Sequence, residues 1–150
     1  MNDVQELYRE IIVDHSKYPR NFGALAGATH QAEGYNPLCG DRVKVFLKIE
    51  GETIRDIRFQ GAGCAISTAS ASLMTEKLKG RTRVEASALF ARFHDLVAGD
   101  AHRVAGASEQ DKLAAFSGVR EYPVRVKCAT LAWHAMRTAL ESKQEVVSTE

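Results

Sequence analysis

The sequence predicts an α+β fold in which a small antiparallel sheet of three strands packs against several helices. Apolar and polar residues alternate from Val43 to Ile49 and again from Ile57 to Phe59, which is the period-two pattern of half-buried strands. The turn Glu50-Gly51-Glu52 between them is short, so the two strands should be antiparallel neighbours. Elsewhere, apolar residues recur at the spacing of amphipathic helices, and these helices must cover one face of the sheet.

Size and charge limit the classes of function. The chain has 150 residues, 45% of them hydrophobic, which suits one domain (1–150) with a single core. Its 20 basic and 19 acidic residues give a net charge of +1 with no long basic run, which disfavours a nucleic acid or an anionic membrane as partner. No apolar stretch approaches the roughly 18 residues of a membrane helix, and no signal-peptide pattern is present. We therefore expect a cytoplasmic protein.

The first predicted element is an amphipathic helix. Apolar residues from Val4 to Ile12 follow helical spacing, with Asn2 or Asp3 as cap and Pro19 as stop. His15 lies on the apolar stripe of this helix, where a packed or hydrogen-bonded histidine is commoner than a metal ligand. The glycine-rich stretch that follows predicts a connection with one short edge strand at about 31–35, the third strand of the sheet.

The second long strand ends at Gly61-Ala62-Gly63, where the backbone needs unusual angles or a close approach. A helix rich in alanine and serine is predicted from about Cys64 to Lys79, ended by Gly80. Thr82-Arg83-Val84-Glu85 then predicts a capping box for the next helix, which Gly99 closes.

Between Gly99 and the last helix, the sequence predicts less regular structure. His94 and His102 flank the end of the preceding helix and are interpreted as surface histidines. A short helix is expected at 108–116, and Pro123 predicts an extended approach to Cys128. The final helix should run from there to about Leu140, followed by a frayed polar tail at 142–150.

The cysteines carry most of the functional information. Three is an odd number, no pair has C-x-x-C spacing, and a reducing compartment disfavours disulfides. Metal binding or thiol chemistry is therefore the leading hypothesis. The alternative is that each cysteine is simply a small buried apolar residue.

Each cysteine falls at an expected junction between elements. Cys64 and Cys128 stand at the predicted first turns of helices, where free N–H groups and the helix dipole favour a thiolate. Cys39 and Asp41 lie in a glycine-containing turn, a setting that suits a ligand able to leave. Three thiolates and a carboxylate make the four ligands of tetrahedral zinc. Against this, aspartate is common in turns because it bonds nearby N–H groups, and the spacings match no zinc finger.

Two cations beside the last cysteine are candidates for charge compensation. Three thiolates and a carboxylate around a divalent ion leave a net negative charge that needs neutralising if it is buried. Arg125 and Lys127 share parity in the expected extended segment next to Cys128, so both should point the same way. Their alternative interpretation is a solvated strand face.

Three motifs resemble the IscU/SufU family of iron–sulfur assembly proteins. They are Asn-Pro-Leu-Cys-Gly-Asp at 36–41, Phe-Gln-Gly-Ala-Gly-Cys-Ala-Ile-Ser at 59–67 and Arg-Val-Lys-Cys-Ala-Thr-Leu at 125–131. The Leu-Tyr and Asp-His pairs at 7–8 and 14–15 and the Pro-Arg-Asn-Phe-Gly run at 19–23 are also similar to this family. The resemblance covers about Leu7 to Leu140.

Departures from the IscU type point to the SufU type. Lys127 stands where IscU-type proteins place a histidine before the last cysteine. The Leu-Pro-Pro-Val-Lys chaperone-docking motif is replaced by Tyr-Pro-Val-Arg at 122–125, so neither a histidine ligand nor a dedicated Hsp70 partner carries over. The extra helical segment between Gly80 and about Ala105 resembles the insertion that distinguishes SufU-type members.

The resemblance implies a fold, a metal and a reaction. The fold is an α+β sandwich, with zinc held by Cys39, Asp41, Cys64 and Cys128. The activity is that of a zinc-dependent sulfurtransferase, in which a histidine of a SufS-type, pyridoxal-phosphate cysteine desulfurase takes a place on zinc and frees Cys39 to accept persulfide sulfur. The partners that the resemblance implies are this desulfurase and downstream iron–sulfur assembly proteins.

Two other functions remain open at this point. One is a non-enzymatic scaffold on which the same thiolates hold a [2Fe–2S] cluster. The other is a purely structural zinc domain that serves as a docking module.

Overall fold

The computed structural model describes residues 3–37, 40–98, 115–116, 119, 122–141 and 146–148. Its elements, in chain order, are α1 (Asp3–Lys17), β1 (His30–Asn36), β2 (Asp41–Glu50), β3 (Thr53–Ala62), α2 (Ala65–Leu78), α3 (Arg83–Ala98), α4 (Pro123–Leu140) and β4 (Val146–Ser148). Gly99 and His102 lie outside the described residues, and so does most of the short helix expected at 108–116. Within those residues, no helix combines the length and apolarity needed to cross a membrane.

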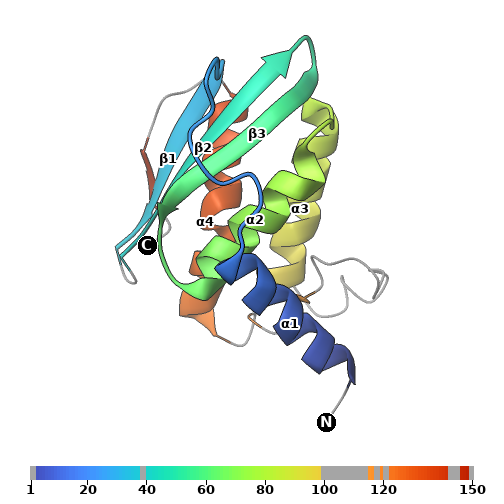
Figure 1. Ribbon diagram of the computed structural model, residues 1–150, viewed down its shortest axis with the longest axis vertical. Coiled ribbons are helices and arrows are strands. Elements are labelled where there is room, and N and C mark those ends of the chain that lie inside the picture. Colours follow the sequence, from blue (N-terminus) through green and yellow to red (C-terminus); the bar gives the residue numbers. More distant parts are fainter. Residues whose placement is uncertain are drawn as a thin grey trace.

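The sheet has the strand order β3-β2-β1-β4 (Figure 1). The first three strands are antiparallel, which confirms the predicted three-stranded meander. β4 adds a fourth strand, parallel to β1, through the pairs Glu33 with Val146 and Tyr35 with Ser148. This pairing differs from the frayed tail predicted for 142–150, because the open edge of β1 offers unpaired N–H and C=O groups that a further strand can satisfy.

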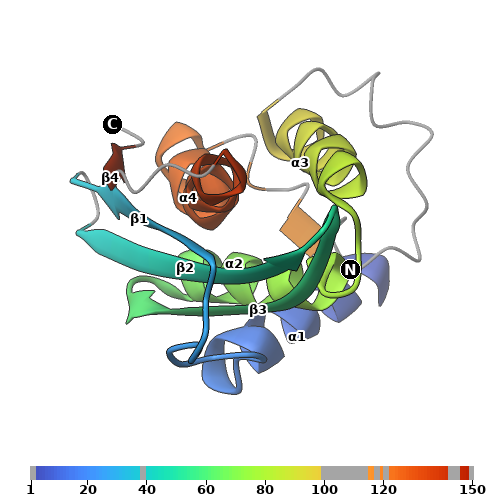
Figure 2. The same ribbon diagram turned by 90° about the horizontal axis from the view of Figure 1, so that it is seen from above.

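Helices α2 and α4 pack on the sheet, whereas α1 lies beyond β3, against α2 (Figure 2). α4 lies against β1 and β2, α2 lies against β3, and the two helices contact each other. The side chains predicted to face the helices on β2 and β3 are buried: Val43, Val45, Leu47, Ile49, Ile57 and Phe59. The period-two pattern therefore selected the correct face, and α2 and α4 supply the apolar surface that covers it.

α1 is held against α2 by a buried histidine. His15 is 1% exposed, and its Nδ1 lies 2.7 Å from the hydroxyl oxygen of Ser72 on α2. The same hydroxyl accepts a hydrogen bond from the backbone N–H of Arg20, at 2.8 Å. The interpretation of His15 as a packed, hydrogen-bonded residue is confirmed.

α3 begins with the predicted capping box and packs on α4. The backbone N–H of Glu85 donates to Thr82 Oγ1 at 3.1 Å, and the N–H of Thr82 donates to Glu85 Oε1 at 3.0 Å. Farther along, the ring of Phe93 stacks on Trp133 of α4 with centroids 4.6 Å apart. These contacts fix the relative positions of the two helices.

The start of α4 corrects the sequence prediction. The helix begins at Pro123 rather than near Cys128, because proline suits the first turn of a helix, where its missing N–H has no partner to lose. Tyr122, directly before it, has an extended backbone. Cys128 is therefore in the second turn, and its thiol lacks the free N–H groups of a helix start. Arg125 and Lys127, two residues apart on a helix, point about 200° apart rather than the same way.

Candidate metal centre

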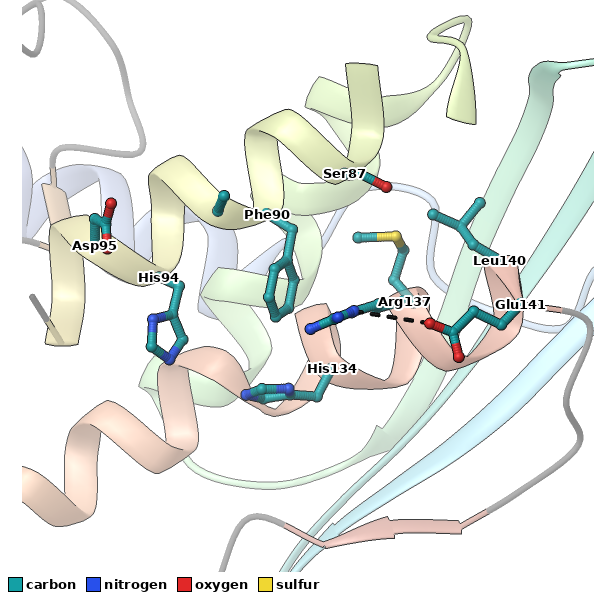
Figure 3. A pocket seen from close by; sticks show the side chains of 10 residues that line it. Ser87, Phe90, His94, Asp95, His134, Arg137, Leu140 and Glu141 are labelled. Carbon is teal, nitrogen blue, oxygen red and sulfur yellow. Dashed lines mark ion pairs between the residues drawn. The ribbon is translucent and has the colours of Figure 1, made fainter. Parts of the chain in front are cut away.

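Side chains able to bind a ligand gather in a cleft between two helices and in a cluster of potential metal ligands. The cleft, of about 530 Å³, lies between α3 and α4 and is walled in part by Phe90, His94, His134 and Arg137. Figure 3 shows the imidazoles of His94 and His134 turned toward each other, and their ring centroids are 6.1 Å apart. Burial, together with the nearby charges of His94 and Arg137, lowers the pKa of His134, so this imidazole is neutral at pH 7.

Only one of the two histidines in this cleft was considered in the sequence analysis. His94 is exposed, which confirms its interpretation as a surface residue. His134 was not singled out, because it falls inside the apolar pattern of the last helix, and only the packing of α3 on α4 brings it opposite His94.

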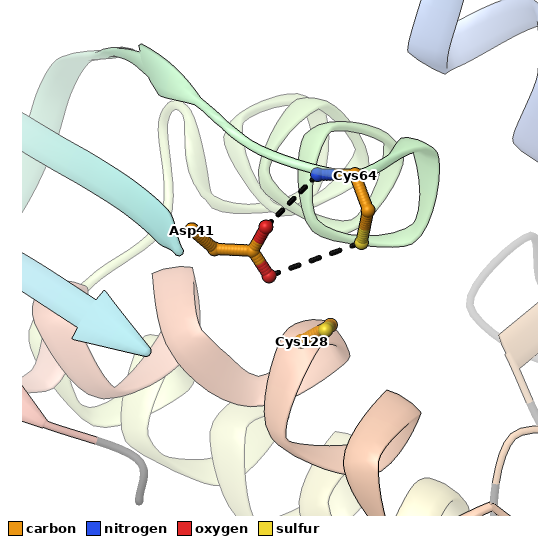
Figure 4. Close-up of side chains that lie close together, drawn as sticks. All are labelled: Asp41, Cys64 and Cys128. Atoms are coloured by element: carbon orange, nitrogen blue, oxygen red, sulfur yellow. Dashed lines mark hydrogen bonds between the residues drawn. The ribbon is translucent and has the colours of Figure 1, made fainter. Parts of the chain in front are cut away.

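The second place is a cluster of three predicted ligands, Asp41, Cys64 and Cys128 (Figure 4). One ligand atom from each lies within 4.8 Å of the others, and no other group of three or more potential metal ligands occurs in the described part of the chain. The three come from the start of β2, the residue that caps α2 and the second turn of α4. The fold thus joins residues that are 87 positions apart in the sequence.

Asp41 is 1% exposed and is oriented by the residues before α2. Its Oδ1 accepts a hydrogen bond from the backbone N–H of Cys64 at 2.9 Å, and its Oδ2 lies 3.8 Å from Cys64 Sγ. A Cβ at Gly63 would lie 2.7 Å from Asp41 Oδ1, so only glycine leaves room for the carboxylate. The predicted close approach at 61–63 is confirmed, also at Gly61, where a Cβ would lie 2.1 Å from the backbone oxygen of Arg42.

The two thiols differ in exposure and in partners. Cys64 is exposed and caps α2, as predicted, and its sulfur accepts a hydrogen bond from the backbone N–H of Ser67 at 3.5 Å. Cys128 is 2% exposed, and the side-chain amide of Asn36 donates to its sulfur at 3.7 Å. Sequence reasoning gave Asn36 no role, although it opens the motif that contains Cys39. Its position directly before that turn was the available signal.

The fourth predicted ligand, Cys39, lies outside the described residues. Its neighbours are described: the backbone N–H of Gly40 donates to the oxygen of Asn36 at 2.8 Å, and Gly40 has a φ of +72°, which glycine tolerates. In the sequence, Cys39 precedes Asp41, a member of the cluster, by two residues.

The structure does not bring the two predicted cations together. The guanidinium of Arg125 lies over the ring of Tyr122, 4.9 Å from its centroid, and the side chain of Arg125 is exposed. Lys127 is half-buried on another side of α4. The prediction that Arg125 and Lys127 point the same way is wrong, because both residues lie in helix α4 rather than in an extended segment.

The cluster has the donors and spacing of a metal site. Tetrahedral zinc with bonds of about 2.3 Å to sulfur places its ligand atoms about 3.8 Å apart. The three ligand atoms, within 4.8 Å of one another, need to approach by about 1 Å at most. Two thiols and a carboxylate are zinc donors, and the thiols would equally suit iron. The residues present therefore fit the metal that the family resemblance implies.

Comparison with known proteins identifies the class. The model of the NifU-like N-terminal domain family matches residues 7–129. The chain belongs to this family, and the expected relationship to IscU and SufU iron–sulfur assembly proteins is confirmed.

Individual relatives cover nearly the whole chain. The zinc-dependent sulfurtransferase SufU of Bacillus subtilis (strain 168) is 36% identical over 142 residues, which are 95% of each chain. The iron–sulfur cluster assembly scaffold protein IscU of Streptococcus pyogenes serotype M1 is 37% identical over 141 residues, 94% of this chain and 87% of that one.

A solved structure supports the same fold. It is described as an iron–sulfur cluster assembly scaffold protein for the SUF system, from Fervidobacterium islandicum AW-1. It superposes with a TM-score of 0.78 at 35% identity, over 91% of this chain and 98% of that one.

Proposed function

We propose that this protein is a zinc-dependent sulfurtransferase of iron–sulfur cluster biogenesis, which accepts persulfide sulfur on Cys39 from a SufS-type cysteine desulfurase. The observation that carries the proposal is the convergence of Asp41, Cys64 and Cys128 from three separate elements. A buried carboxylate and two thiols brought this close have little use in a core, whereas they are the ligands of a tetrahedral site.

The similarity to a sulfurtransferase supports this choice over a scaffold. The Bacillus subtilis relative that matches 95% of this chain is named for zinc-dependent sulfur transfer. Lys127 occupies the place of the histidine that IscU-type proteins carry. α3 fills the segment of the SufU-type insertion.

In this proposal the four ligands have different roles. Asp41 and Cys128 are buried and held by hydrogen bonds, so they are the permanent ligands, and Cys64 is fixed by its position as helix cap. Cys39 completes the set from a turn. Zinc, when bound, keeps coordinated thiols deprotonated at neutral pH and lowers their nucleophilicity.

The transfer step is an exchange at sulfur. When Cys39 is freed by docking of the partner, its thiolate attacks the outer sulfur of the persulfide on the desulfurase cysteine. A new S–S bond forms on Cys39 as the S–S bond of the partner breaks, and the electron pair leaves on the cysteine of the partner as a thiolate. Sulfur moves without any net change in oxidation state.

The test of this function is the variant Cys39→Ala. We expect the desulfurase to lose its stimulation by this protein, measured as alanine or sulfide production with excess cysteine, while the two proteins still bind each other. Cys39→Ser is the matched control, because its hydroxyl occupies the same position without a nucleophilic sulfur. If turnover is stimulated equally by Cys39→Ala and the unmodified protein, the protein acts as a structural docking module instead.

A second candidate, a scaffold for a [2Fe–2S] cluster, is favoured by one specific observation. The Streptococcus pyogenes relative, as similar as the sulfurtransferase, is named an assembly scaffold. The thiols of Cys64 and Cys128 could hold iron as well as zinc. Aerobic purification separates the two candidates: colourless protein with about one zinc per chain supports transfer, whereas brown protein with stoichiometric iron supports the scaffold.

A further inference from the structure

Asn36 occupies a central position in the candidate metal centre. It is the last residue of β1, it is 0% exposed, and in the sheet it pairs directly with Asp41. Its backbone oxygen accepts the N–H of Gly40 and so closes the turn that contains Cys39. Its side-chain amide donates to Cys128 Sγ at 3.7 Å. One residue thus connects three of the four proposed ligands.

The side chain has a chemical role distinct from that of the backbone. Closing the turn and pairing with Asp41 use only main-chain atoms, which any residue would supply. The amide reaches a sulfur that becomes a thiolate when it binds a metal. A thiolate has no proton to give, so only the N–H end of the amide can be its partner.

We propose that Asn36 is a positioning residue of the metal centre, whose amide holds the Cys128 thiolate as a permanent ligand. The inference rests on the proposed function. It adds a residue outside the ligand set and gives a reason why one particular sulfur, that of Cys128, stays bound.

The physical reason is the effect of an N–H···S bond on a thiolate. The donated hydrogen bond withdraws charge from the sulfur and fixes the direction of its lone pairs, as partners beyond the ligands do in other metal sites. Cys128 is then oriented toward the metal and is a poor nucleophile. Burial alone would shield this sulfur, but it would not orient the lone pairs.

The variants Asn36→Leu and Asn36→Asp test the amide. Leucine keeps the approximate volume and aspartate keeps a side-chain oxygen, but neither carries the N–H donor. We expect the zinc dissociation constant, measured by competition with a chromophoric chelator, to rise about 10-fold in both. Thr130→Val is the matched control, because its buried hydroxyl, also on α4, bonds to the backbone oxygen of Val126.

A spectroscopic measurement separates positioning from a general loss of packing. In the cobalt-substituted protein, the sulfur-to-cobalt charge-transfer band depends on the energy of the sulfur lone pairs, which an N–H···S bond lowers. We expect the band of Asn36→Leu to move to lower energy, while that of Thr130→Val stays in place. Persulfide located by peptide mass spectrometry should be confined to Cys39 in the unmodified protein and divided between Cys39 and Cys128 in Asn36→Leu.

The outcomes distinguish this inference from the proposed function. If the unmodified protein binds one zinc, but Asn36→Leu and Asn36→Asp match Thr130→Val in dissociation constant and band position, then Asn36 has no positioning role and the metal centre stands. If the unmodified protein binds neither zinc nor cobalt, the proposed metal centre itself is refuted.

Discussion

The metal-ligand cluster and the α3–α4 cleft are two regions at different points of the same helix. Cys128 lies near the start of α4 and His134 and Arg137 lie toward its end, so about 14 Å of helix separates Cys128 from Arg137. The cleft has room for a small molecule, at about 530 Å³. The cluster instead brings ligand atoms from three elements within 4.8 Å of one another.

The cluster and the cleft differ in whether their functional groups point toward one another. This property, rather than volume, identifies the site that can do chemistry. In the cluster, the carboxylate and both sulfurs each have a hydrogen-bond partner that aims them at a common point. In the cleft, Arg137 lies over the ring of Phe90 and pairs with Glu141 at 3.9 Å, so its cation is directed at residues of the protein itself. We therefore assign metal chemistry to the cluster.

The largest effect that would test this comparison is expected from Asp41→Ala. The variant removes one of four ligands as well as the acceptor of the Cys64 N–H. A structural zinc site contributes about 10–16 kcal/mol through its ligands together, so losing one should weaken zinc binding about 100-fold and lower the melting temperature of the zinc-loaded protein.

Asp41→Asn serves as the matched control for that variant. It keeps an oxygen that can accept the Cys64 N–H, but it lacks the charge of the carboxylate, so zinc loss should persist while the fold is less disturbed. Metal content and thermal melting of the purified proteins measure both effects. Equal zinc content and melting temperature in Asp41→Ala would remove Asp41 from the ligand set.

A smaller effect is expected from Gly63→Ala, which tests whether space around the carboxylate matters. The new methyl group would lie 2.7 Å from Asp41 Oδ1, so the carboxylate must turn away from the cluster. We expect the zinc dissociation constant to rise about 10-fold, because the variant disturbs the orientation of a ligand without removing it.

Gly34→Ala is the control for Gly63→Ala. Its Cβ would lie 3.0 Å from the side chain of Leu131, within the core and away from the carboxylate. It should lower the free energy of unfolding by about 1–3 kcal/mol, as overpacking does, and leave the zinc dissociation constant unchanged. If both glycine variants reduce zinc affinity equally, the effect is general loss of packing rather than displacement of Asp41.

The sequence predicted the strands and helices whose signals are local. Alternation placed Val43 to Ile49 on the correct face, and the Thr82–Glu85 capping box formed as expected. The predicted start of α4 was wrong because a proline can either end a helix or occupy its first turn. The residues just after Pro123 are exposed or half-buried, so no apolar pattern in the sequence around Pro123 marks them as the first turn of a helix.

The candidate site was predicted through residue type, and its supporting contacts were not. Cysteine and aspartate are few and chemically specific, so Asp41, Cys64 and Cys128 could be grouped before their positions were known. Asn36 and His134 are ordinary residues whose roles depend on partners about 90 and 40 positions away in the chain, respectively. No periodicity or spacing marks such contacts.

The smallest predicted effect lies in the cleft and concerns His134. Because the pKa of the His134 imidazole is lowered in the folded protein, mainly by burial, the unfolded chain binds a proton at this imidazole more readily. The stability that depends on neutral His134 is complete above about pH 6.5 and is lost as the pH falls through the lower pKa of the folded state.

The variant His134→Gln tests this dependence. In His134→Gln, the metal-free protein should lose less stability between pH 7.5 and pH 5 in urea unfolding. Arg137→Gln, which removes one nearby charge but not the burial, should give a smaller change of the same sign. An identical loss of stability in His134→Gln and the unmodified protein would show that the cleft does not disfavour the protonated imidazole, and its difference from the cluster would then rest on geometry alone.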